Sequence, residues 1–126
     1  ENYSGAEFAK EFAVGLSTNG ALEKVNISNN NIIHYEEEQA KAAGKALSDA
    51  LAQNTVLKEL DLSKNAPYSS SKGPAFAQEF AAGLGTNGAL TSLNVSNNNI
   101  GILATTDSKY DASGVTALAD AIGKHQ

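Results

Sequence analysis

Apolar side chains recur with two different periods along the chain, and each period predicts a different element. A spacing of three or four residues places side chains on one face of a helix, whereas strict alternation predicts a strand with one solvated face. The helical spacing occurs at Phe8, Phe12 and Leu16; Leu47 and Leu51; Phe76, Phe80 and Leu84; and Val115, Leu118 and Ile122. The alternation occurs at Val25 and Ile27, Leu60 and Leu62, and Leu93 and Val95. The predicted order is helix, strand, helix, strand, helix, strand, helix, and strands joined through helices run parallel.

Two segments of the chain have nearly the same sequence. Shifted by 68 residues, Gly5–Ile32 aligns with Gly73–Ile100, and 19 of the 28 aligned positions are identical. A looser copy, Asn54–Asn65, lies between them. The corresponding residues Leu22, Leu57 and Leu90 stand 35 and 33 positions apart, so the repeating unit is half of 68 residues. A period of that length indicates stacked repeats. One such unit cannot cover its own apolar face, so each copy supplies the surface against which its neighbour packs.

Each copy contains the pattern Leu-x-x-Leu-x-Leu-x-x-Asn, with other aliphatic residues at some Leu positions, at residues 22–30, 57–65 and 90–98. This pattern resembles the leucine-rich repeats, and the preceding helix with its Asn-x-x-Leu junction is similar to the ribonuclease-inhibitor-like subfamily. The resemblance implies an α/β solenoid, a segment of a horseshoe with parallel strands on the concave side and helices on the convex side. It also implies that Asn30, Asn65 and Asn98 form a buried ladder whose amides bond the backbone. The units are longer than the roughly 20 to 29 residues typical of these repeats.

These boundaries define a single domain over residues 1–126, with units at about 5–37, 38–72 and 73–110 and a final helix at 111–126. The final helix aligns with the second helix at an offset of 71, so that His125 falls opposite Asn54. The sequence therefore stops where another strand would begin. Because the strands of Val25 and Val95 would be unpaired edges, we expect either a longer parent array or end-to-end self-association.

The composition of the chain disfavours several classes of partner and of site. Nine Lys, no Arg and a net charge of −5 disfavour a nucleic-acid partner. No apolar run approaches the roughly 18 residues of a membrane span, so no membrane partner is expected. The absence of Cys leaves no disulfide or thiolate metal site. Two glycosylation sequons, at Asn26 and Asn94, would place glycans on the concave strands, which favours a cytoplasmic location over a secretory one.

Several catalytic signals have simpler explanations, and no catalytic residue, metal ligand or cofactor is predicted. Gly83, Gly85 and Gly88 spell a dinucleotide motif, but they end a predicted helix instead of opening one. The Asn-Gly pairs at residues 19–20 and 87–88 fit left-handed helix C-caps. The run Glu36–Glu38 fits solvated acids at the positive end of a helix. His34 and His125 lie too far apart in the repeat order to share a site, and both are expected to be lone surface histidines.

Two surfaces are candidates for contacting a partner. The concave face carries small and polar side chains: Lys24, Asn26, Ser28, Glu59, Asp61, Ser63, Ser92, Asn94 and Ser96. It has none of the aromatic or Arg side chains that usually carry binding energy. The four Tyr residues all precede a predicted helix, so Tyr35, Tyr68 and Tyr110, with Tyr3, would line one rim. Tyr is a favoured interface anchor, although each could instead pack on its own loop.

The sequence therefore predicts a non-catalytic protein–protein interaction module, part of a longer repeat array of receptor or effector type. Two alternatives stay open. The repeats could be a regulatory or sensor segment of a larger enzyme, or a purely structural unit without a ligand of its own.

Overall fold

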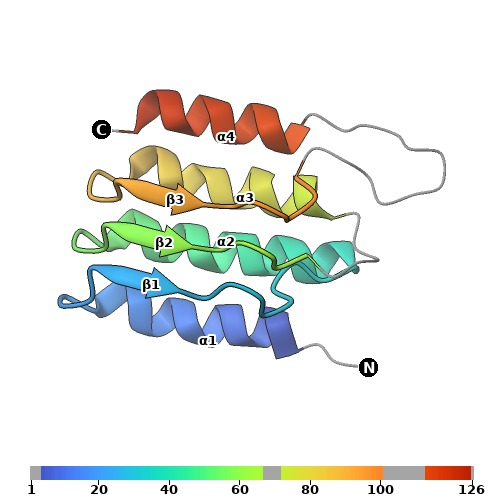
Figure 1. Ribbon diagram of the computed structural model, residues 1–126, viewed down its shortest axis with the longest axis horizontal. Coiled ribbons are helices and arrows are strands. Elements are labelled where there is room, and N and C mark those ends of the chain that lie inside the picture. Colours follow the sequence, from blue (N-terminus) through green and yellow to red (C-terminus); the bar gives the residue numbers. More distant parts are fainter. Residues whose placement is uncertain (1–3, 67–71, 101–112, 126) are drawn as a thin grey trace.

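The computed structural model describes residues 4–66, 72–100 and 113–125. Within them, helices and strands alternate along the chain (Figure 1). The elements are α1 (Ser4–Thr18), β1 (Lys24–Asn26), α2 (Glu37–Gln53), β2 (Glu59–Asp61), α3 (Gly73–Thr86), β3 (Ser92–Asn94) and α4 (Ser113–Lys124). This order is the one that the two apolar periods predicted.

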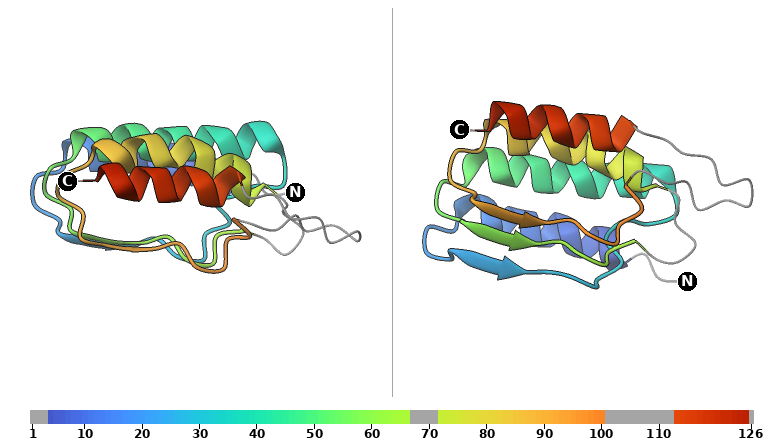
Figure 2. Two further views of the ribbon diagram at one scale, coloured as in Figure 1. Left: turned by 90° about the horizontal axis from the view of Figure 1, so that it is seen from above. Right: turned by 45° about the horizontal axis from the view of Figure 1, so that its top comes forward.

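The molecule has two layers. The strands form a parallel sheet in the order β1-β2-β3, and the helices lie side by side behind it, each beside its sequence neighbour (Figures 1 and 2). The register places Lys24, Glu59 and Ser92 in one row across the sheet and Asn26, Asp61 and Asn94 in the next. The predicted mixed helix–strand architecture with a parallel sheet is therefore confirmed.

The apolar core lies between the two layers. Leu60 in β2 and Leu62, which follows β2, are buried in one cluster with helical Leu and Phe side chains. Two glycines let α2 and α3 approach closely. A Cβ on Gly44 would lie 2.6 Å from the carbonyl oxygen of Phe76, and a Cβ on Gly83 would overlap the backbone of Ser48. The Gly83 N–H donates to Ser48 Oγ at 2.6 Å.

The predicted apolar stripe is not buried on every helix. Phe8 on α1 and Val115 and Ile122 on α4 are exposed, as is Leu22 before β1. The reason is their place in the stack, because α1 contacts only α2 and α4 contacts only α3 among the helices. Burial in this architecture depends on having a neighbour on both sides.

Candidate functional site

Asparagine side chains connect the strands where the chain leaves the sheet. Asn65 Nδ2 donates to the carbonyl oxygens of Leu62 at 2.8 Å and Ile27 at 3.1 Å. Asn65 Oδ1 accepts the backbone N–H of Asn30 at 2.7 Å. One buried amide therefore holds β1 and β2 together through both of its polar atoms.

Asn98 makes the same contacts one strand further on. Its Nδ2 donates to the Leu62 and Val95 carbonyl oxygens at 2.9 and 3.0 Å. Its Oδ1 accepts the Asn65 N–H at 2.6 Å.

Asn30 differs from the other two, since it is exposed where the resemblance implied burial. Its Nδ2 donates to the Ile27 and Ser28 carbonyl oxygens at 3.0 and 3.1 Å, both within its own repeat. No described strand precedes β1, so no strand in the described part of the chain covers Asn30 from that side.

A second row of asparagines, which sequence reasoning missed, lies at the opposite end of the strands. Asn54 Nδ2 donates to the Leu16 and Asn19 carbonyl oxygens at 2.7 and 3.1 Å. Asn87 Nδ2 repeats this toward the Leu51 and Asn54 carbonyl oxygens at 2.8 and 3.0 Å. The signal that could have found this row is the Asn-x-x-Leu junction, which recurs with the same period as the leucines.

The same side chains also start the strands, which corrects the prediction of left-handed C-caps. Asn87 is extended, with φ −78° and ψ 132°, because its Oδ1 accepts the N–H groups of Ala89 and Leu90 at 2.9 and 2.7 Å. None of the described glycines has a positive φ. The left-handed residues lie after the strands instead: Asn29, Asn31, Lys64, Asn97 and Asn99. Asn tolerates this conformation better than most residues, which gives the outer members of each Asn-Asn-Asn run a backbone role.

The exposed face of the sheet, predicted as the concave face, consists of two rows with different roles. In the row of Asn26, Asp61 and Asn94, each side-chain oxygen accepts the N–H of the residue two positions later, at 2.9, 2.9 and 3.0 Å. These bonds turn the chain out of each strand. The hydrogen bonds from the Ser63 hydroxyl and then from its N–H lower the pKa of Asp61, and Ser63 itself is buried, contrary to its expected place on the solvated face.

The other row is directed to solvent. Lys24, Glu59 and Ser92 are all exposed, and Lys24 Nζ lies 3.8 Å from Glu59 Oε2. An exposed ion pair of this kind contributes little to stability. These three positions are therefore the part of the sheet face that can change without cost to the fold.

The tyrosine rim is described only at Tyr35. Its ring is partly exposed and stacks on His34, with ring centroids 4.2 Å apart. His34 is buried, and its Nδ1 accepts the N–H of Glu36 at 3.0 Å, so the prediction that it is a surface histidine is wrong. It is buried because it immediately follows Ile32 and Ile33, which lie in the core. Tyr3, Tyr68 and Tyr110 lie outside the described residues, so the rim stays a prediction.

Other motifs have structural explanations. Gly83 and Gly85 lie inside α3 and Gly88 follows it, so a strand comes after the motif, not before it. Glu36–Glu38 are exposed at the start of α2, where Glu37 pairs with Lys41 at 3.3 Å and Lys72 at 3.6 Å. Within the described ranges, no three His, Cys, Asp or Glu side chains gather as metal ligands would. The helices described there are too short or too polar to cross a membrane.

Comparison with known proteins supports one family. A leucine-rich repeat model matches residues 89–108, which include β3 and its asparagine. This segment is similar to a leucine-rich repeat. A tropomodulin C-terminal domain from Caenorhabditis elegans is similar over 94% of this chain and 92% of its own, with 11% identity and a TM-score of 0.33. No curated protein matches the sequence.

Proposed function

We propose that the chain is a non-catalytic protein-binding module, built as a ribonuclease-inhibitor-like solenoid within a longer repeat array. A leucine-rich repeat motif of this kind suggests a protein-interaction module. One observation carries the proposal for this chain. In each repeat, the apolar positions stay apolar and the ladder position stays Asn. By contrast, Lys24, Glu59 and Ser92, which lie at equivalent positions across the sheet, change from basic to acidic to neutral.

That contrast is what a binding surface on a fixed scaffold requires. The row of Asn26, Asp61 and Asn94 is occupied by backbone hydrogen bonds, so its freedom to adapt to a partner is small. The row beside it has no such bonds to the strand ends and varies. Large aromatic anchors would come from the rim, of which Tyr35 is the described member. The proposed interface therefore combines rim tyrosines with the variable row, and the rim supplies most of the affinity.

The experiment is affinity capture from an extract of the native source with matched variants as bait. One bait carries Tyr35→Ala, Tyr68→Ala and Tyr110→Ala, and the other carries Lys24→Glu and Glu59→Lys, which exchanges the charges of one exposed pair. We expect a protein that binds the unmodified chain, binds the charge-exchanged chain more weakly, and is lost with the tyrosine variant. A partner retained equally by all three folded baits would overturn the proposed interface.

A separate assay addresses catalysis. We expect no turnover in a broad hydrolase screen and no stoichiometric zinc after dialysis. Turnover that survives repurification, or retained zinc, would contradict a non-catalytic role.

A further inference from the structure

A buried histidine side chain holds the backbone at the start of α2. His34 is 3% exposed, and its Nδ1 accepts the N–H of Glu36 at 3.0 Å. Glu36 is the N-cap residue of α2, and its own side chain makes no capping hydrogen bond. In a capping box, the N–H of the N-cap residue is bound by a side chain from the first turn of the helix. Here the bond comes from His34, two residues before.

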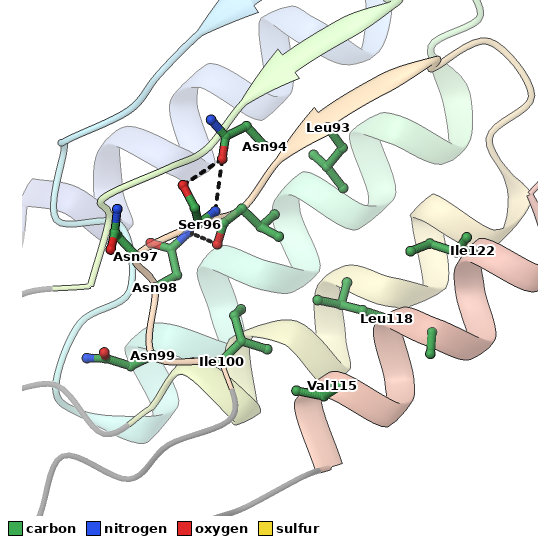
Figure 3. Close-up of a pocket in the computed structure, with 12 residues that line it drawn as sticks. Leu93, Asn94, Ser96, Asn97, Asn98, Asn99, Ile100, Val115, Leu118 and Ile122 are labelled. Carbon is green, nitrogen blue, oxygen red and sulfur yellow. Dashed lines mark hydrogen bonds between the residues drawn. The ribbon is translucent and has the colours of Figure 1, made fainter.

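The chain makes the same kind of bond elsewhere with amide side chains. The Oδ1 atoms of Asn26 and Asn94 accept the N–H two residues later at 2.9 and 3.0 Å, and the bond of Asn94 to Ser96 is drawn in Figure 3. Asn54 and Asn87 do so at 2.9 Å each. An amide oxygen accepts at any pH, whereas Nδ1 of a histidine accepts only while it carries no proton. Imidazole is the side chain whose charge ordinarily changes near neutral pH.

The hydrogen bond determines the protonation state of the ring. Because Nδ1 accepts, the imidazole of His34 is neutral and its proton is on Nε2. A proton taken from solvent forms an N–H bond at Nδ1 and adds one positive charge, so that both ring nitrogens become donors. Two donors then face each other, at Nδ1 and at the Glu36 N–H. Protonation therefore breaks this bond.

Protonation also places a charge in the interior, at a corner where several elements meet. Ile33 donates its N–H to the Asn65 carbonyl oxygen after β2, and the first turn of α1 lies against Asn31. The charged groups on the elements around this corner all reach solvent: Glu7 and Lys10 of α1, Lys64 after β2, Glu36, Glu37, Glu38 and Lys41 at the start of α2, and Lys72 before α3. Water and the exposed carboxylates of Glu36 and Glu38 solvate a cation better than the interior does, so the protonated ring is drawn outward.

Tyr35 depends on the position of this ring. The rings of His34 and Tyr35 stack with their centroids 4.2 Å apart, and the Tyr35 side chain is 39% exposed. The described member of the rim is thus held at the surface by a side chain that can gain a proton.

We infer that His34 is a protonation switch, which holds the start of α2 and the Tyr35 ring while it is neutral and releases both when it is protonated. The bond requires the neutral ring, so it is present at about pH 7.5 and is lost as the pH falls through the range in which imidazoles ordinarily gain a proton. Binding of a partner at the rim should weaken in the same direction. This last step rests on the proposed binding role of Tyr35, whereas the loss of the bond does not.

The switch can be tested on the chain alone by NMR and hydrogen exchange. The chain has two His and no Cys, so few other groups titrate in this range. Between about pH 7.5 and about pH 5, we expect the protection of the Glu36 amide, corrected for intrinsic exchange, to fall about fivefold or more. The ring signals of Tyr35 should shift with the same midpoint as the imidazole signals of His34.

Two matched variants separate the switch from a general response to pH. His34→Asn provides the acceptor that the chain uses elsewhere for this bond, and it should hold the Glu36 N–H equally at both pH values. His125→Asn removes the other histidine and should keep the full response. Circular dichroism checks the fold of both variants, and if His34→Asn does not fold, the titration of the unmodified chain decides.

Three results would overturn the switch. The first is a His34 ring that gains its proton without a change at the Glu36 amide or the Tyr35 ring. The second is a ring that stays neutral down to about pH 5. The third is a response that persists in folded His34→Asn or disappears in His125→Asn.

Failure of the proposed function would be seen separately, as capture of no protein by the unmodified chain while the exchange response is present. A captured protein that binds equally at the two pH values would overturn the regulation of the rim.

Discussion

The first and third copies of the repeat have nearly the same sequence and different surroundings. Within each, the two Phe rings of the helix stack in the same way, with centroids 5.8 Å apart for Phe8 and Phe12 and 5.6 Å apart for Phe76 and Phe80. Yet Phe8 is 38% exposed and Phe76 is 1% exposed. The same holds before the strand, where Leu22 is 48% exposed and Leu90 is 3% exposed.

The difference shows what each part of the chain determines. The sequence of a copy sets its helix, its strand and the contacts within the copy, which are alike in both. The neighbours set burial, because α3 lies between α2 and α4 whereas α1 has only α2 beside it. Identical residues should therefore contribute unequal amounts to stability, and paired substitutions can measure this directly.

The largest expected difference is at the phenylalanines. Phe76→Ala leaves a cavity in the core and should lower the free energy of unfolding by about 3–5 kcal/mol. Phe8→Ala removes a side chain that is already partly solvated and should cost about 1–2 kcal/mol. Urea denaturation of both variants provides the measurement, and equal losses would contradict the account.

The leucines that precede the strands should show a smaller difference of the same sign. Leu90→Ala should cost about 2–4 kcal/mol, whereas Leu22→Ala should cost under about 1 kcal/mol because the side chain is largely in water. Thermal unfolding followed by circular dichroism would separate them. If Leu22→Ala lowered the midpoint as far as Leu90→Ala does, a neighbour would have to cover Leu22 in solution.

Within the asparagine ladder, buried Asn65 and exposed Asn30 allow the same comparison for polar side chains. Asn65→Ala deprives the Asn30 N–H of this acceptor and the Ile27 and Leu62 carbonyl oxygens of one of their two donors, and should cost about 1–3 kcal/mol. Asn30→Ala should cost under about 1 kcal/mol, because the side chain is exposed and water can replace it. Asn31 is not a neutral control, since its φ of 54° is strained for Ala. Similar urea midpoints for the Asn65 and Asn30 variants would refute the ladder's role.

The smallest effect concerns pH. Asp61 occupies the position of Asn26 and Asn94, and hydrogen bonds from Ser63 lower its pKa below the usual 3.8. A carboxyl group with a lower pKa in the folded state stabilises the protein above the unfolded pKa, and this contribution is lost as the pH falls through the folded value. Asp61→Asn makes the second copy resemble the other two and should slightly flatten the loss of stability below pH 3.8. A steeper acid limb in this variant would contradict the hydrogen-bond assignment.

The sequence was sufficient for features that every copy shares. Periodicity gave the element order and the parallel sheet, because both follow from residues within one repeat. Periodicity could not give the exposure of Leu22 and Asn30, because on one side of the first copy the described residues include no neighbouring repeat. Sequence reasoning also missed the burial of His34 and the row formed by Asn54 and Asn87. Both depend on contacts with other parts of the chain, which the local apolar period does not show. The left-handed residues were assigned to the Asn-Gly pairs because Gly is the usual signal for that conformation, whereas here Asn and Lys64 adopt it.

Hydrogen exchange at three equivalent amides tests the central claim most directly. Ile27, Leu62 and Val95 hold the same position in successive copies, and the N–H groups of the first two donate to Asp61 and Asn94 of the next repeat. The account predicts slow exchange at Ile27 and Leu62 and fast exchange at Val95 in the isolated chain, because among the described residues no strand follows Val95 in the sheet. Protection of Val95 equal to that of Leu62 would show that position in the stack does not decide how each copy is covered.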